Sequence, residues 1–290
     1  MSTRLIVISP VRNEGEHLSR TINSVVNQLV KPDRWIIVND GSSDSTGQLA
    51  EQAATNHDWI QVIHRQDRGS RKSGVGVVDT FYDGYRLIEK EPWDYLVKLD
   101  GDLHFGSDVF EKILLAFSEE TKLGISGGEI FYERNGQRTI ESKRDPAFHV
   151  RGATKFYRRA CWDEMGGLLP VTGWDTLDEV KANMLGWTTK RVPEAHFLHL
   201  RPTGAADGSW RDSFKNGRGS YIAGYHPIYM LSKCVRRLPC EPAFIQSLGL
   251  FAGFFSGFLS SAERIKDREL VCYLRRQQLR RLLGRASIWE

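Results

Sequence analysis

Short apolar runs alternate with helically spaced segments along the first 120 residues. The first run covers residues 4–9, and in 13–29 apolar side chains recur every three or four positions, as in an amphipathic helix. Further apolar runs lie at 34–40, 59–64 and 95–100, and further helical stretches begin near residues 44, 74 and 109. Strands of about six residues that alternate with helices predict a parallel sheet covered on both faces.

The pattern changes after residue 122. Strands are predicted at 124–133, 149–157 and 190–200, with short helices at 161–168 and 174–187. Pro193 is expected to interrupt the hydrogen bonding of its strand or to lie on an edge. We therefore predict one continuous domain over 1–200, made of a half at about 1–110 and a half at about 111–200. A helical extension of different composition follows at 201–290.

Polar residues directly follow three of the predicted parallel strands. These segments are Pro-Val-Arg-Asn-Glu at 10–14, Asp-Gly-Ser at 40–42 and Asp-Gly-Asp at 100–102. Parallel strands end at the same edge of a sheet, and ligands of such sheets bind outside that edge. We expect the three segments to meet there.

Asp100 and Asp102 are one residue apart at the end of a predicted strand. Residues i and i+2 of a strand point to one face, so the two carboxylates can aim at one spot. Their repulsion would leave one of them protonated unless a cation compensates. Mg²⁺ or Mn²⁺ accepts a few protein oxygens and keeps positions for substrate phosphates. The pair therefore predicts a divalent metal site for a diphosphate group, although surface turns also produce this spacing.

The segments VISPVRNEGEHLSRTINSVVNQ, IIVNDGSSDSTGQLA and LVKLDGDLHF together resemble glycosyltransferase family 2. The likeness is strong over about residues 4–110 and continues to about 200. It implies a GT-A fold, that is, an α/β Rossmann-like mixed sheet flanked by helices. It also implies a metal-dependent inverting transfer of a sugar, most simply from a UDP-sugar, to a hydroxyl or phosphate acceptor.

The resemblance assigns roles to residues at the strand ends. Pro10, Arg12 and Glu14 would line the nucleotide pocket, with Glu14 near the ribose. Asp40 would accept a hydrogen bond from the base, typically from uracil N3–H. The structural alternatives are an acid favoured by a helix dipole for Glu14 and a turn-forming carboxylate for Asp40.

Two further sites follow from the same resemblance, and two histidines in the last strand of the domain are considered beside them. Asp100 would lie near the sugar or ribose and share the metal site with Asp102, the principal ligand of Mn²⁺ or Mg²⁺. The loop between the third and fourth strands carries Arg71 and Lys72, which could hold diphosphate oxygens or belong to a basic surface loop. His196 and His199 could add a metal ligand or contact phosphate, although a structural role is the simpler interpretation.

The general base is expected at the start of the helix near 174–187. Family members place an acidic pair there, often Glu-Asp, whereas this chain has Asp178-Glu179 in the reverse order, with Asp175 one turn earlier. All three are candidates for the base that takes the acceptor proton. Asp178 is preferred, then Glu179, then Asp175, and one of the others could cap the helix.

The extension is basic and contains an uncharged stretch. Residues 201–290 hold fifteen Lys or Arg and seven Asp or Glu, which favours an anionic partner such as membrane lipid or a phosphorylated substrate over a merely solvated face. Residues 244–262 carry no charge, and Gly249, Gly253 and Gly257 recur every fourth position. An interfacial helix, a packing helix with a homodimer contact, and a membrane span are the alternatives. Residues 274–285 predict a basic amphipathic helix, and Arg281 stands where processive members have Trp, which argues against a polymer synthase.

Composition bounds location and rival functions. The four cysteines show neither a zinc nor a disulfide spacing, and the N-terminus lacks signal-peptide anatomy, so a cytoplasmic location, peripheral on the inner face of the membrane, is expected. The predicted partners are a nucleotide-sugar donor and a saccharide or lipid-linked acceptor, without nucleic acid. A nucleotidyltransferase of similar fold would need a G-x-G-T-R loop that is missing here. A non-catalytic, membrane-associated binding protein is the other rival.

Overall fold

The computed structural model describes residues 3–67, 69, 74–134, 136–141, 145–201, 208–239 and 244–289. Its strands are β1 (Leu5–Val11), β2 (Arg34–Asn39), β3 (Ile60–His64), β4 (Tyr95–Leu99), β5 (Leu103–Phe105), β6 (Leu123–Arg134), β7 (Gln137–Ile140), β8 (Thr154–Arg158) and β9 (Thr188–His199). Its helices are α1 (Leu18–Val26), α2 (Thr46–Asn56), α3 (Val75–Tyr85), α4 (Val109–Glu119), α5 (Arg159–Met165), α6 (Trp174–Met184), α7 (Ser209–Ile222), α8 (Pro227–Arg237), α9 (Ile245–Leu259) and α10 (Arg268–Leu282).

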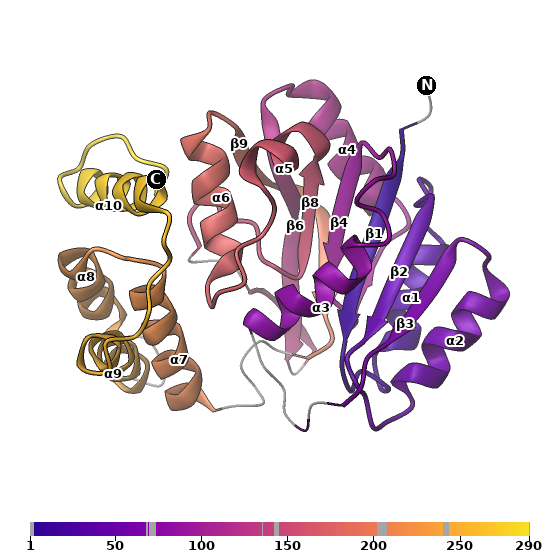
Figure 1. Ribbon diagram of the computed structural model, residues 1–290, viewed down its shortest axis with the longest axis horizontal. Helices are drawn as coiled ribbons and strands as arrows, with labels where there is room; N and C mark the ends of the chain where they lie inside the picture. Colours follow the sequence, from indigo (N-terminus) through magenta and orange to yellow (C-terminus); the bar gives the residue numbers. More distant parts are fainter. Residues whose placement is uncertain are drawn as a thin grey trace.

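All nine strands belong to one mixed sheet (Figure 1). Its order is β3-β2-β1-β4-β8-β6-β9-β5, and β7 pairs with β6 outside this path. The four strands β3, β2, β1 and β4 are mutually parallel, and β8 then runs antiparallel to β4. The predicted parallel half and the predicted mixed α/β fold are therefore confirmed.

Helices cover both faces of the sheet, as the apolar spacing predicts. One face packs against α1, α2 and α4 through residues such as Leu18, Ala50 and Phe110. The other face packs against α3 and α5, through residues such as Phe81 and Trp162, and against part of α6. Two separate apolar cores result, one on each side of the central strands.

Pro193 lies inside the sheet, at an irregularity of β9. The parallel register with β6 pairs Gly128 with Val192 and then Glu129 with His196, so Pro193 and its two followers fall outside the regular ladder. The missing N–H of Pro193 therefore falls where the ladder is interrupted, and no paired N–H is required there. The first of the two expectations for this residue is the one observed.

Helices α7 to α10 form a layer beside α6, at the left of Figure 1. A third apolar cluster joins them to Leu177 and Val180 of α6. The predicted glycine stripe of α9 faces α7, where an added Cβ on Gly253 would lie 1.9 Å from the carbonyl oxygen of Phe214. The two helices thus meet backbone to backbone, which explains three glycines inside one helix.

No helix of the described segments is long and apolar enough to cross a membrane. Within the uncharged stretch 244–262, α9 covers fifteen residues. The described residues of this stretch therefore do not form the membrane-spanning helix that was one of its alternatives. The domain boundary near residue 200 stays a prediction.

Candidate active site

The three polar segments meet at the carboxyl edge of the parallel strands. The N–H of Asp40 donates to Val11 O at 2.9 Å, which joins the ends of β1 and β2. An added Cβ on Gly101 would lie 2.7 Å from Cγ1 of Val11 and 3.4 Å from Cγ of Glu14. Gly101 thus lets the β4 end approach the β1 end closely, because a larger residue has no room.

Arg12 links the first two segments. Its guanidinium donates to the carbonyl oxygen of Asp40 at 2.5 Å and to Oδ1 of Asp67 at 2.7 Å. The hydrogen bond from Arg12 holds the pKa of the Asp67 carboxyl below its usual value. Arg12 therefore ties the end of β1 to Asp40 after β2 and to Asp67 after β3.

Asp40 is buried and oriented by a residue that sequence reasoning missed. Arg65 follows β3 and donates to Oδ1 of Asp40 at 3.0 Å, while its Nε pairs with Asp83 at 2.7 Å. Arg65 also donates to the hydroxyl of Thr80 at 2.5 Å. Its position directly after a parallel strand was the available signal, since the other strand-end residues were selected on that ground.

Asp102 lies in a buried network with Glu14, which the sequence placed in another role. Arg201 donates to Oε1 of Glu14 at 2.5 Å and to Oδ2 of Asp102 at 3.2 Å. Nε2 of His199 is 3.3 Å from Oδ1 of Asp102, and its Nδ1 is 3.0 Å from Oε2 of Glu141. Burial would raise the pKa of Asp102, but the hydrogen bond from His199 and the charges of His199 and Arg201 lower it. Arg201 was not foreseen, although it follows the strand that carries His199.

Asp100 has a cation of its own. The buried ammonium of Lys98 contacts Oδ1 of Asp100, and the Asp100 N–H donates to Ala153 O at 3.0 Å. Protein cations thus compensate both carboxylates of the pair, which removes the repulsion from which the sequence argument inferred a metal. His196 is not part of this network, since its ring packs on Phe131 at 4.9 Å.

Asp178 and Glu179 are completely enclosed. Nζ of Lys155 is 2.7 Å from Oδ1 of Asp178 and 2.9 Å from Oε1 of Glu179, and the side chains of all three have no exposed surface. Tyr157 donates to Oδ2 of Asp178 at 2.7 Å, and His149 lies 2.8 Å from Oε2 of Glu179. Burial raises the pKa of Asp178 to about 6, although the charge of Lys155 opposes the shift. These acids hold α6 against β8.

Asp175 is the partly exposed acid of the three and lies in the first turn of α6. An added Cβ on Gly152 would be 3.2 Å from Cβ of Asp175 and 2.9 Å from the ring of Trp174. The ammonium of Lys98, which contacts Asp100, lies 5.6 Å from the same ring. The N-terminus of α6 therefore adjoins the end of β4, where the donor segments meet.

Arg71 and Lys72 lie outside the described residues. Gly74, where their loop ends, is described, and an added Cβ there would be 3.1 Å from Cα of Thr172. Gly74, at the start of α3, thus lies against the segment that leads into α6. Pro10 occupies the second-last position of β1 and pairs with Val38.

Comparison with known proteins decides the family. The model of the family described as Glycosyl transferase family 2 matches residues 6–170, which is more than half of the chain.

The chain belongs to glycosyltransferase family 2.

This membership supports a glycosyltransferase enzyme over the nucleotidyltransferase and the non-catalytic alternatives.

Curated relatives of this glycosyltransferase resemble it over part of their length. It is 27% identical over 136 residues to the uncharacterized glycosyltransferase EpsJ of Bacillus subtilis. The matched residues make up 46% of this chain and 36% of EpsJ. It is 29% identical over 116 residues to poly-beta-1,6-N-acetyl-D-glucosamine synthase of Staphylococcus aureus, which covers 40% of this chain and 26% of the synthase. The matched stretch thus spans well under two thirds of these relatives.

Solved structures agree on the fold. The mannosyltransferase PcManGT from Pyrobaculum calidifontis, in complex with GDP-Man and Mn²⁺, matches with a TM-score of 0.57 at 15% identity, covering 99% of this chain and 77% of that one. TarS of S. aureus matches with a TM-score of 0.53 at 17% identity, and the match covers 90% of this chain and 44% of the TarS chain. The GT-A fold of this glycosyltransferase is thereby confirmed.

The His199 contacts make stability depend on pH. Burial would lower the pKa of His199, but the hydrogen bonds to Asp102 and Glu141 outweigh it and raise the pKa from 6.5 to about 10. A raised folded-state pKa gives stability that is complete below about pH 6.5 and is lost as pH rises through 10. In EDTA, we expect the unfolding free energy to fall by on the order of 2 kcal/mol over that range.

Urea titrations at several pH values measure this loss. His199→Gln should flatten the profile, whereas His57→Gln, at the end of α2, should leave its slope unchanged. An equal slope in wild type and His199→Gln would contradict the assignment.

Proposed function

We propose that this glycosyltransferase transfers a sugar, with inversion, from a UDP-sugar bound at the carboxyl edge of the sheet to an acceptor hydroxyl. The observation that supports it most is the meeting of Arg12, Asp40 and Asp102 from three separate strand ends. Asp40 is positioned by Arg65 to accept the N3–H of uracil. Arg12 and Arg201 supply positive charge where a diphosphate would lie.

A divalent cation is part of the proposal. Within the part of the chain that the structure describes, no group of three or more His, Cys, Asp or Glu residues could hold a metal. Asp102 and His199, however, bring a carboxylate oxygen and an imidazole nitrogen within 3.3 Å of each other, and an ion there would replace the proton that His199 Nε2 holds against Asp102. Two protein donors suit an ion that takes its remaining ligands from diphosphate oxygens and water, and the nitrogen favours Mn²⁺ over Mg²⁺.

The donor set therefore fits, with Asp102 and His199 as the residues that would hold the cation and Asp100 beside them. When bound, the cation would neutralise charge on the departing diphosphate. Arg201 would then be released from Asp102 to contact phosphate oxygens, and the contact with Lys98 holds the Asp100 side chain in place.

Asp175 is our proposed general base. Among the three acids of α6, Asp178 and Glu179 have no exposed surface, whereas Asp175 is partly exposed next to the β4 end. A base must come within about 3 Å of the hydroxyl that it deprotonates. Trp174, beside Asp175, is buried in the core with the ammonium groups of Lys98 and Lys155 near its ring, so Asp175 is the residue of this turn that can reach an acceptor.

The test is a panel of sugar nucleotides, UDP- and GDP-linked, each with and without Mn²⁺. We expect a UDP-sugar with Mn²⁺ to raise the melting temperature and to be hydrolysed slowly without acceptor. If no sugar nucleotide of the panel shifts the melting temperature with any metal, the proposal is overturned. Preference for a GDP-sugar would overturn the assignment of uracil to Asp40.

Replacing Asp102 tests the metal role directly. Asp102→Asn should weaken Mn²⁺-dependent nucleotide binding by roughly 10–100-fold, because the charged oxygen ligand is lost. Isothermal titration of UDP with and without Mn²⁺ measures the effect. Asp58→Asn, an exposed acid between α2 and β3, serves as the control and should bind as wild type. Equal Mn²⁺ dependence in both variants would remove Asp102 from the metal site.

The acceptor is proposed to be a saccharide or a lipid-linked sugar presented at an anionic membrane. The exposed side of α9 supports the membrane contact, since Leu248, Phe251 and Leu259 there are 54%, 42% and 89% exposed. A contiguous apolar face of this kind marks an interaction surface. A homodimer through the same face is the competing occupant.

A further inference from the structure

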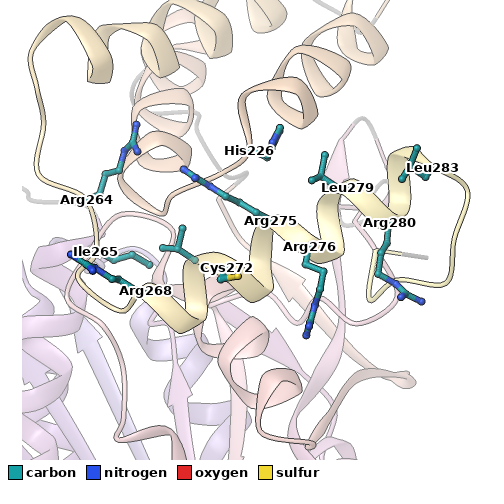
Figure 2. Close-up of a pocket in the computed structure, with 11 residues that line it drawn as sticks. His226, Arg264, Ile265, Arg268, Cys272, Arg275, Arg276, Leu279, Arg280 and Leu283 are labelled. Atoms are coloured by element: carbon teal, nitrogen blue, oxygen red, sulfur yellow. The ribbon is translucent and has the colours of Figure 1, made fainter.

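A cavity lies between α10 and the start of α8, away from the sheet edge that carries the acids. Its volume is about 850 Å³, within the usual range for sites that bind small molecules. Its polar lining, shown in Figure 2, consists chiefly of His226, Arg264, Arg268, Arg275, Arg276 and Arg280. No acidic side chain is among the described residues that line it. The cavity is therefore strongly electropositive.

Two of these arginines and the histidine face one space. In Figure 2 the guanidinium groups of Arg264 and Arg275 extend toward each other beside His226, whereas Arg276 and Arg280 extend to the other side of α10. Nε of Arg275 donates to Gly224 O at 2.8 Å, which fixes the direction of its guanidinium. Burial and the charge of Arg264 lower the pKa of Arg275, as expected for like charges held together without an anion.

Each of the three groups has a donor to offer. Arg264 is stacked on the rings of Tyr221 and Phe258, at 4.3 and 5.0 Å, and its buried Nε has no hydrogen-bond partner among the described residues. Nδ1 of His226 accepts from the N–H of Ile228 at 3.3 Å, so Nε2 of the neutral ring carries the proton. A buried N–H without a partner is costly, so a shift of the Arg264 guanidinium that brings this N–H to an anion would be favourable.

The remaining walls are apolar and continue onto the surface. Ile265, Val271, Leu279 and Leu283 line the cavity, and Leu283 is 67% exposed. Phe258, under Arg264, is 40% exposed and belongs to the same helix as Leu248 and Phe251. A ligand whose anionic head lies on Arg264 and Arg275 would thus have apolar surface available for a chain.

We propose that this cavity binds the phosphate headgroup of an anionic membrane lipid, with Arg264, Arg275 and His226 as phosphate donors and the α9 face against the acyl chains. The site rests on the proposed membrane contact and adds to it a named headgroup pocket that lies apart from the transfer site. The juxtaposition of clustered, acid-free arginines with an exposed apolar helix face favours a phospholipid over a soluble anion, since a soluble phosphate would leave the apolar face without a role.

The experiment compares two double variants with the same change of charge. Dihexanoyl phosphatidic acid, which is soluble, is titrated into wild type, Arg264→Gln/Arg275→Gln and Arg276→Gln/Arg280→Gln by isothermal calorimetry. We expect the first variant to lose at least about tenfold in affinity and the second to bind nearly as wild type. Equal losses in the two variants would overturn the site, because the arginines would then act only through general charge.

Further arms separate the sources of phosphate. Inorganic phosphate should compete only weakly, and vesicles of phosphatidylcholine with phosphatidic acid should bind, whereas pure phosphatidylcholine vesicles should not. Inorganic phosphate that binds as tightly as the lipid, without vesicle binding, would overturn the proposal, as would a dimer in which the lipid cannot bind.

A nuclear magnetic resonance readout uses the wild-type protein alone and does not depend on the folding of any variant. The His226 imidazole signal in the nuclear magnetic resonance spectrum of the wild-type protein should shift when the soluble lipid is added, and an unchanged signal counts against the site. Hydrolysis of the sugar nucleotide should be equal in all three proteins. Loss of hydrolysis in wild type would contradict the proposed transfer and leave the lipid result intact.

Discussion

Asp175→Asn is expected to lower kcat for sugar transfer by about 10²–10⁴-fold, because the amide cannot accept the proton of the acceptor hydroxyl. Nucleotide binding should remain, since Asp175 lies at the start of α6 and the proposed donor contacts come from the ends of β1, β2 and β4. Steady-state rates with the donor found by the nucleotide panel, together with UDP titration, separate the two effects.

The matched control is Asp212→Asn. Asp212 is also a partly exposed acid in the first turn of its helix, α7, so both substitutions change the helix-dipole interaction in the same way. Asp212→Asn should keep full activity. An Asp175→Asn enzyme with a wild-type kcat would exclude Asp175 as the base and return attention to Asp178 and Glu179.

Lys155→Met is expected to have the largest effect on stability, a loss of roughly 3–5 kcal/mol in the free energy of unfolding. The substitution leaves two fully buried carboxylates, Asp178 and Glu179, without the ammonium that contacts both. Burial acts to lower the pKa of Lys155, but the charges of Asp178 and Glu179 outweigh it and raise that pKa, so Lys155 is a cation in the folded protein. Urea unfolding at neutral pH measures the loss.

A surface ion pair provides the comparison. Lys112→Met removes the exposed pair between Lys112 of α4 and Asp108, the residue that precedes this helix, and should cost less than about 1 kcal/mol. Adding Asp178→Asn to Lys155→Met should recover part of the stability, because one of the two uncompensated charges is removed. Equal costs at Lys155 and Lys112 would show that the buried network contributes little.

The parallel half of the fold could be predicted because its signals are local. Each of β1 to β4 is an apolar run, and the strand ends carry the polar residues that later meet, so periodicity and the shared carboxyl edge were sufficient. The order after β4 could not be predicted. The insertion of β8 between β4 and β6, and the placement of β5 beside β9, depend on contacts between residues far apart in the sequence.

The site divides in the same way. Asp40, Asp100 and Asp102 could be selected from their positions after strands, but their cations, Arg65, Lys98 and Arg201, could not be assigned to them. Asp178 was preferred over Asp175 because it belongs to the acidic pair that family members place at the start of this helix. In the fold, Lys155 of β8 pairs with Asp178 in the interior, which leaves Asp175 as the accessible acid. A contact between a helix and a distant strand is not visible in any local sequence pattern.

The glycine contact between α7 and α9 has a consequence for recognition. Side chains that interlock must give up rotamers when helices associate, whereas Gly249, Gly253 and Gly257 have none to give up. At Gly253 the fit is set by the main chain of Phe214 and Arg218, whereas Gly257 lies against the ring of Tyr221, so the angle between the two helices depends on few side-chain rotamers. The phenylalanines on the opposite side of α9 are consequently carried by a helix of fixed orientation. A partner could bind them without first ordering that helix.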